Sequence, residues 1–180
     1  LREEAFLNAG LKITIEDKRE ESADKEEKDR KDVLCYEGGI REFVTFLNTN
    51  KTPVHEDVIY MSGKKDDAMA EIAMQYTDTY NEVIVSFANN VHTPEGGMLT
   101  AALNKYGKKM NILKGDDKVS GEDCREGISC VISVKLTNAQ FEGQTKAKLG
   151  NSEIRTLVNS IVSEALEQYL EENPATGKAI

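Results

Sequence analysis

Histidine and cysteine, which often bind metals or act in catalysis, are scarce in this chain. Its 180 residues include two histidines, His55 and His92, and three cysteines, Cys35, Cys124 and Cys130. The histidines are isolated, and the cysteines lack the spacing of a metal site, so neither a catalytic histidine nor a zinc centre is predicted. An odd, unpaired set of cysteines is typical of a reducing cytoplasm, where we expect buried or half-buried thiols.

The chain also lacks a long apolar run and an excess of positive charge. No stretch approaches the roughly 20 apolar residues that a membrane-spanning helix needs. The formal net charge is -9, whereas a protein whose main surface binds DNA phosphates is usually basic. We therefore expect neither a membrane span nor a primary DNA-binding module. The length and the 39% hydrophobic content suit a single α/β domain with its own core.

The N-terminal part is predicted to form a hairpin. Leu11, Ile13 and Ile15 alternate with polar residues, as in a half-buried strand, and residues 33–36 form the returning strand. Between the two strands, residues 16–32 are almost all charged, with both signs mixed. Such a composition predicts an exposed, mobile hairpin loop.

A helix and three strands are predicted next. Apolar residues spaced by three and four place one buried stripe on a short helix over residues 40–47. Strand candidates follow at residues 58–61, 69–76 and 81–89, separated by turn-forming residues. Together the three strands predict an antiparallel meander with one face free for helices.

The C-terminal part ends in the longest predicted helix. A short helical turn at residues 120–127 precedes an alternating strand at 128–134. From Ile154 to Leu170, apolar residues hold one face of a helix over five turns. Asn151 or Ser152 is the expected N-cap, and Asn173-Pro174 is expected to end the helix.

The most informative segment lies just before that helix. Residues 140–153 read Gln-Phe-Glu-Gly-Gln-Thr-Lys-Ala-Lys-Leu-Gly-Asn-Ser-Glu and contain Gln144, Thr145 and Lys146. An ammonium and an amide can both donate to a phosphate, and the N-terminus of the following helix favours anions. The residues alone leave two interpretations open, a phosphate-binding loop or lysines that are merely solvated.

Segment 140–153 resembles the loop with which the B subunits of type IIA topoisomerases contact the terminal phosphate of ATP. Its amino-acid sequence is most similar to the gyrase B family. Further segments that resemble this family lie along almost the whole chain, at residues 5–13, 36–40, 86–90, 93–97 and 125–127. The resemblance implies the transducer domain, an α+β two-layer fold of the ribosomal protein S5 domain 2 type. In that fold a mainly antiparallel sheet with a left-handed βαβ crossover is covered by helices, one of them long and C-terminal.

The resemblance also implies a role for the loop. It assigns the γ-phosphate contact to Gln144, Thr145 and Lys146, with Lys146 as the catalytic residue. It implies ATP and Mg²⁺ in the full-length protein but none bound to this part alone. The family's magnesium-binding Asn, general-base Glu and glycine-rich lid belong to a preceding domain, and its DNA-cleavage carboxylates to a later one.

The implied partners are ATP, DNA and a gyrase A subunit in an A2B2 assembly in the bacterial cytoplasm. The chain itself is expected to be a monomer or a weak dimer. Residues 100–113 predict a helix that carries Lys105, Lys108 and Lys109 with little acidic compensation. These lysines, together with Arg41, are candidates for transient contact with a transported duplex. The alternative is that they only solvate an exposed helix face.

The chain departs from the family pattern at one point. After residues 95–97 the family continues with a His-x-x-Gly-Phe segment, whereas here Met98 leads straight to Leu99. We therefore expect residues to be missing at that junction, and we expect residues 1–180 to be one domain excised from a longer protein.

Two other assignments stay open, the corresponding domain of a topoisomerase IV B subunit and a non-catalytic α/β binding module.

Overall fold

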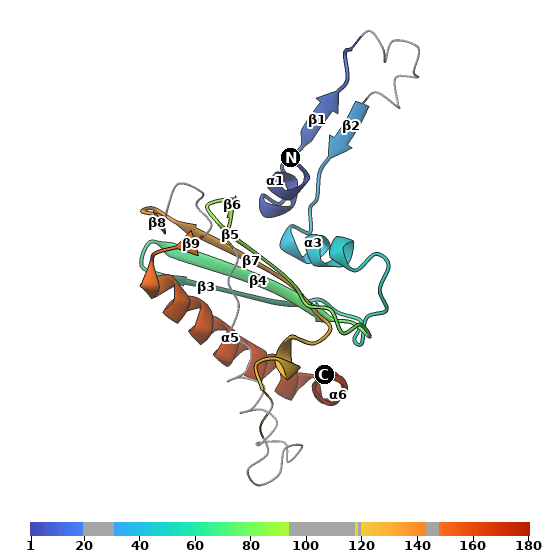
Figure 1. The fold of residues 1–180 in the computed structure, drawn as a ribbon, viewed down its shortest axis with the longest axis vertical. Helices are drawn as coiled ribbons and strands as arrows, with labels where there is room; N and C mark the ends of the chain where they lie inside the picture. The colour runs from blue at the N-terminus through green and yellow to red at the C-terminus, as the bar shows by residue number, and fades with distance from the viewer. Residues whose placement is uncertain (20–30, 94–117, 119, 143–147) are drawn as a thin grey trace.

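The computed structural model describes residues 1–19, 31–93, 118, 120–142 and 148–180 (Figure 1). Within these ranges no helix combines the length and the apolar character that crossing a membrane requires. In chain order the elements are α1 (Arg2–Leu7), β1 (Ile13–Glu16), β2 (Lys31–Leu34), α3 (Ile40–Leu47), β3 (Ile59–Lys65), β4 (Ala68–Tyr76), β5 (Val83–Ala88), β6 (Val91–His92), η2 (Asp123–Arg125), β7 (Ile128–Leu136), β8 (Phe141–Glu142), β9 (Lys148–Leu149), α5 (Ser152–Glu172) and α6 (Pro174–Ala179).

The body of the molecule is a five-stranded sheet in the order β3-β4-β7-β5-β6. Strands β3, β4 and β7 pair antiparallel, β5 runs parallel to β7, and β6 returns antiparallel to β5. The predicted meander is therefore wrong for its third strand, because β7 lies between β4 and β5. The first seven residues of β7 are all buried, whereas β5 begins with three half-buried residues. A strand that is buried on both faces is most stable at the centre of a sheet.

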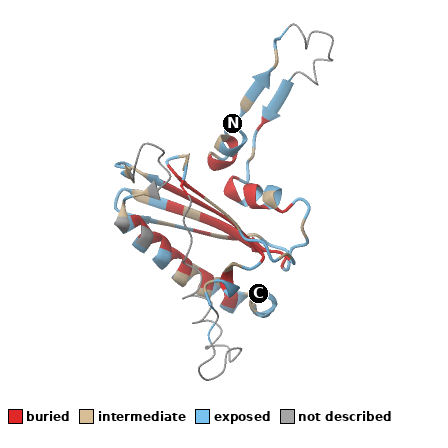
Figure 2. Cartoon of the chain, in the orientation of Figure 1, coloured by how far each residue is buried: buried red, intermediate tan, exposed pale blue. Residues whose placement is uncertain are grey.

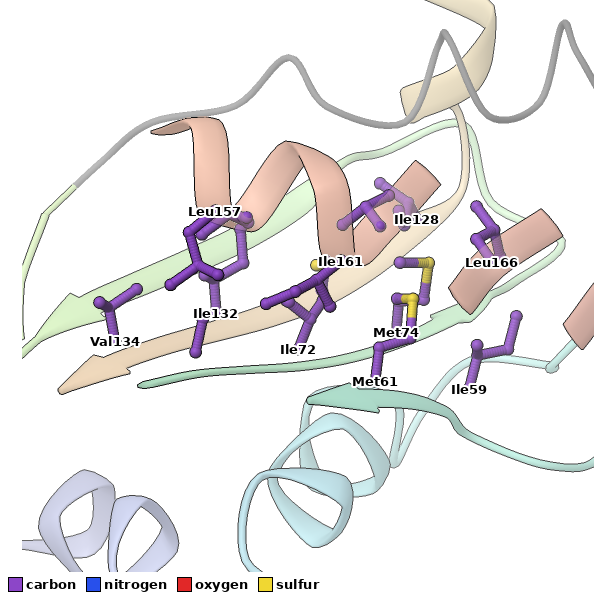
Figure 3. Close-up of a cluster of buried hydrophobic side chains, with 14 of the residues drawn as sticks. Ile59, Met61, Ile72, Met74, Ile128, Ile132, Val134, Leu157, Ile161 and Leu166 are labelled. Atoms are coloured by element: carbon purple, nitrogen blue, oxygen red, sulfur yellow. The ribbon is translucent and has the colours of Figure 1, made fainter. Parts of the chain in front are cut away.

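Helices cover both faces of this sheet, so the expected two-layer arrangement is replaced by three layers (Figures 1 and 2). On one face, Ile161 and Leu166 of α5 pack against the strands in the cluster drawn in Figure 3. On the other face lie α1 and α3, whose Phe6 and Phe43 rings stack with centroids 4.7 Å apart. Neighbouring strand residues point to opposite faces, so the central strands supply apolar side chains to both cores.

The two amphipathic helices lie where the apolar spacing predicts them. Helix α3 spans the predicted residues 40–47, and α5 contains the predicted apolar face from Ile154 to Leu170. Helix α6 is not predicted by the sequence. Its first residue is Pro174, which ends α5 but is tolerated in the first turn of a new helix.

Strands β1 and β2 form a separate hairpin that projects from the body (Figure 1). The prediction of two strands here is confirmed, but the prediction that the first is half-buried is wrong. Three of the four β1 residues are exposed, Ile15 at 38%, and Val33 of β2 is 48% exposed. Among the described residues, no helix or sheet layer covers this hairpin (Figure 2). The charged residues 20–30 and the connection through residues 94–117 lie outside the described residues, so the mobile loop and the crossover's handedness stay predictions.

None of the three cysteines, all of which lie in described parts of the chain, forms a disulfide, but their burial differs from the prediction. Cys124 and Cys130 are buried, whereas Cys35 is exposed. Cys35 follows β2 of the projecting hairpin, which explains its exposure. Burial raises the pKa of Cys130 to about 12, so this thiol stays protonated and unreactive at neutral pH.

His55 is part of a buried polar network at one end of the sheet. Its Nε2 accepts a hydrogen bond from the Tyr76 backbone N–H at 3.0 Å, so Nδ1 carries the proton and donates to the Asp57 carbonyl at 2.8 Å. The Gln75 amide donates to the backbone carbonyl of His55 at 3.0 Å and accepts from Asn48 at the end of α3. His55 is thus a structural residue that needs its neutral form.

The His55 network predicts that stability falls in mildly acidic solution. Burial lowers the pKa of His55 below 6.5, and this outweighs the opposite effect of Asp57. The unfolded chain therefore binds a proton near pH 6.5 that the folded chain rejects, and the free energy of unfolding falls as pH drops below that value. We expect His55→Gln to flatten this decline in urea titrations between about pH 5 and pH 7. A decline of equal slope in the variant would contradict the assignment.

Candidate functional site

The segment with the predicted phosphate-binding residues leaves the sheet as a hairpin. Strands β8 and β9 pair antiparallel, with Phe141 opposite Leu149 and Glu142 opposite Lys148. Residues 143–147 connect the two strands and are called the hairpin tip below; they include Gln144, Thr145 and Lys146 and lie outside the described residues. The structure therefore places the two strands that flank the predicted triplet, β8 and β9, between the end of β7 and the start of α5.

Asn151 closes the base of this hairpin. Its Oδ1 accepts the Gln140 backbone N–H at 2.7 Å, and its Nδ2 donates to the Asn138 carbonyl at 3.3 Å and to Glu153 Oε1 at 2.7 Å. The Gly150 N–H donates to the Gln140 carbonyl at 2.7 Å. Asn151 occupies the predicted N-cap position, but its side chain makes no capping bond to α5 and ties the hairpin down instead. Its bond to Glu153 stabilises the carboxylate and lowers the pKa of that residue.

Helix α5 runs from the base of the hairpin along the sheet to α6 (Figure 1). Gly63 of β3 lets the helix come close, because a Cβ at this position would lie 2.6 Å from Ile161 Cγ1. The buried face of α5 consists of Ile154, Leu157, Val158, Ile161, Val162, Leu166 and Leu170. Apolar contact from Ile154 to Leu170 makes α5 a rigid connection between its two ends.

An open cavity of about 390 Å³ lies under the hairpin base. The β3–β4 turn, the end of β7 and the first turn of α5 form its walls. Asp66, Asp67 and Glu153 line it, opposed by Lys65. Three carboxylates against one ammonium disfavour a phosphate in this space. Among the described residues, no group of three or more His, Cys, Asp or Glu side chains could hold a metal ion.

A second asparagine, Asn89, holds the end of β7, where the hairpin segment begins. Its Nδ2 donates to the Leu136 carbonyl at 2.8 Å, and its Oδ1 accepts the Leu136 N–H at 2.9 Å. Asn89 lies in the family-like segment 86–90 but has no role predicted from the sequence. Two consecutive asparagines directly after a strand could have indicated a tight turn here, because Asn tolerates positive φ. Asn89 and Asn90 have φ values of 47° and 65°.

The predicted DNA-contact residues are only partly described. The guanidinium of Arg41 lies over the Tyr60 ring, 4.0 Å from its centroid, and the Tyr60 hydroxyl donates to Glu71 at 2.6 Å. Arg41 therefore has an intramolecular partner on the α3 side of the sheet. Lys105, Lys108 and Lys109 lie outside the described residues, and the DNA contact of all four residues stays a prediction.

Comparison with known proteins agrees with this architecture. Residues 39–180 match the family described as DNA gyrase B. The whole chain is 49% identical to the DNA gyrase B protein of Bacillus mycoides and 51% identical to that of Clostridium acetobutylicum. It covers 45% and 29% of those two proteins, so it spans less than half the length of these curated relatives.

Solved structures show the same fold. The 43K ATPase domain of Thermus thermophilus gyrase B, in complex with an aminocoumarin, aligns with 99% of this chain and 48% of its own at a TM-score of 0.82 and 34% identity. The topoisomerase IV ATP-binding domain of Francisella tularensis, in complex with a small-molecule inhibitor, covers 99% of this chain and 48% of its own at a TM-score of 0.73 and 22% identity, which shows the fold alone. The architecture is thus that of the ATPase region of gyrase B and topoisomerase IV proteins. Within that class, the chain belongs to the DNA gyrase B family.

Proposed function

We propose that this chain is the transducer domain of a gyrase B protein, within an ATP-dependent type II topoisomerase that negatively supercoils DNA. The observation that carries the proposal is the placement of the β8–β9 hairpin. Its tip holds the Gln-Thr-Lys triplet, and its base is tied by Asn151 to the first turn of α5. Nucleotide state at the tip is thereby connected directly to a long helix.

The donor set of the tip fits the terminal phosphate of ATP. The Lys146 ammonium supplies a full positive charge, and one charge-assisted hydrogen bond contributes about 1.5–3 kcal/mol. The Gln144 amide and the Thr145 hydroxyl add neutral donors. Lys146 would offset the negative charge that develops during phosphoryl transfer. An ammonium and amide donors do not ligate Mg²⁺, so the ion and the rest of ATP would be held by the preceding part of the parent protein.

Helix α5 provides the relay from the hairpin towards the DNA gate. Its 21 residues, at 1.5 Å each, extend about 30 Å. Loss of the γ-phosphate would release the hairpin tip, and the rigid α5 would carry the displacement as a rotation of the whole domain. The proposed partners are a gyrase A subunit, in an A2B2 assembly, and a DNA segment that the domain contacts transiently. The proposed location is the bacterial cytoplasm. A net charge of -9 suits a cavity that lets DNA pass without retaining it.

Two other functions are less well supported. A topoisomerase IV B subunit shares the fold, but the identities of 46–51% to gyrase B proteins favour gyrase. A non-catalytic binding module would give the Gln-Thr-Lys triplet no role at the N-terminus of α5.

Activity of the full-length parent protein tests the proposed function. Combined with its gyrase A partner, the parent is expected to introduce negative supercoils into relaxed plasmid only when ATP is present. Residues 1–180 alone are the matched control and should hydrolyse no ATP. ATP-dependent decatenation without supercoiling would identify a topoisomerase IV protein, and ATP hydrolysis by residues 1–180 alone would contradict the proposal.

A further inference from the structure

Two asparagine side chains from outside the β8–β9 hairpin hold the backbone that leads into it. Asn89 directly follows β5, and Asn151 directly precedes α5. Asn89 binds both backbone groups of Leu136, the last residue of β7. Asn151 binds the N–H of Gln140, the residue before β8. The two amides therefore fix the two ends of segment 136–140, which connects β7 to the hairpin.

The Asn89 amide takes the place of a missing strand residue. The register of β5 with β7 ends at Ala88 opposite Val134, and the main-chain hydrogen bond from the Asn89 N–H to the Val134 carbonyl, at 2.8 Å, lies two residues before the end of β7. The N–H and C=O of a strand residue point to the same side, so both groups of Leu136 face the space that β5 leaves when it turns away. The Asn89 side chain turns into this space and satisfies both groups at 2.8 and 2.9 Å. The next residue, Asn90, connects this turn after β5 to α1, because its side-chain amide donates to the Glu4 carboxylate at 2.8 Å.

Most of the connecting segment is exposed, at Thr137, Asn138 and Gln140, whereas the half-buried Leu136 and, in β9, Leu149 pack against the core beside α5. The direction in which the hairpin leaves the sheet therefore depends on these two apolar contacts together with the hydrogen bonds at the two ends of the segment. A displacement of about 1 Å at a reacting group costs on the order of 100-fold in rate, so these remote bonds matter for chemistry at the tip.

We propose that Asn89 and Asn151 are positioning residues for ATP turnover in the parent protein, acting through the placement of Lys146. The proposal rests on the function proposed above for the hairpin tip. Neither asparagine touches the nucleotide in this scheme. Asn89 sets where the segment leaves β7, and Asn151 sets where it enters β8.

The test uses the full-length parent protein with Asn89→Ala and Asn151→Ala. Each change is expected to lower kcat for ATP about tenfold or more, while KM changes by less than about threefold, because the effect is on positioning rather than on binding. In a Lys146→Ala background, the same changes should cause no further loss, since there is then no ammonium to misplace. Hydrogen exchange over residues 134–142 should become faster in both variants.

Asn173→Ala is the matched control, because it removes an asparagine bond at the far end of α5, where the Asn173 amide donates to the Tyr169 carbonyl at 2.9 Å. This control should leave kcat unchanged. Conservative changes separate the anchor from simple helix capping. Asn151→Asp keeps the acceptor for the Gln140 N–H but loses the donor to Glu153 and sets a carboxylate beside it, so it should restore only part of kcat. Asn151→Ser keeps a good N-cap residue but is too short to reach the Gln140 N–H, so it should lose as much kcat as Asn151→Ala.

Three results would overturn the positioning roles. These are unchanged kcat in both alanine variants, an equal loss in Asn173→Ala, or a full further loss in the Lys146→Ala background. Failure of the proposed function gives a different result, because Lys146→Ala would then leave turnover normal whatever the asparagine variants do.

Discussion

Lys146→Ala in the full-length parent protein is expected to lower kcat for ATP by about 100- to 1,000-fold, the usual effect of removing one transition-state donor. The ammonium is proposed to meet the γ-phosphate where charge develops during transfer. A lysine in the connection between two short strands adds little to core packing, so thermal unfolding of the chain should not change. Steady-state ATP turnover and a thermal melt of the same preparation measure the two effects.

Lys148→Ala is the matched control for this prediction. It removes the same charge from β9, two residues beyond Lys146 and outside the Gln-Thr-Lys triplet. We expect turnover in the control to fall by less than about threefold. Lys146→Arg should give an intermediate rate of ATP turnover, because arginine keeps the positive charge but carries it on a group of different shape. Near-normal turnover in Lys146→Ala would remove the basis for the proposed phosphate contact.

Gly127→Ala is expected to destabilise the domain by about 2–5 kcal/mol, combining a positive-φ penalty with overpacking. Gly127 precedes β7 with φ 71°, and a Cβ there would lie 2.4 Å from the Thr77 carbonyl oxygen and 2.7 Å from that of Thr79. Both contacts are to backbone, which cannot move aside as a side chain would. The Gly127 carbonyl also accepts the Thr77 N–H at 2.8 Å. The melting temperature should fall by about 5–15 °C.

Gly10→Ala separates the two causes of this loss. Gly10 has φ 79°, but a Cβ there meets no atom within 4 Å. The control therefore carries the backbone penalty alone, about 1–2 kcal/mol. Equal melting temperatures for the two variants would show that the close approach of Gly127 to Thr77 does not contribute.

Elements with a strong local pattern could be predicted from the sequence. The apolar spacing places α3 at the predicted residues and gives α5 its buried face. The alternation at residues 128–134 identifies β7, and the short helical turn before it is confirmed as η2. In each case neighbouring residues carry the information, because helix and strand periodicity are local properties.

The order of the strands and the support of the hairpin could not be predicted in this way. The position of β7 between β4 and β5 depends on burial across the whole sheet. The Asn89 bonds to Leu136 join residues 47 apart in sequence, and the Asn151 bond to Gln140 joins residues 11 apart. Such bonds between side chain and backbone leave no periodic signal. The phosphate contact of Lys146 is implied by the family resemblance and stays a prediction, whereas the anchoring of its hairpin could not be predicted.

A structure of the parent's ATPase region with a non-hydrolysable ATP analogue tests the central claim most directly. We predict Lys146 Nζ within about 2.7–3.2 Å of a γ-phosphate oxygen, with Asn151 still bound to the Gln140 N–H. A γ-phosphate held entirely by other residues, with Lys146 directed into solvent, would contradict the proposed role of the β8–β9 hairpin.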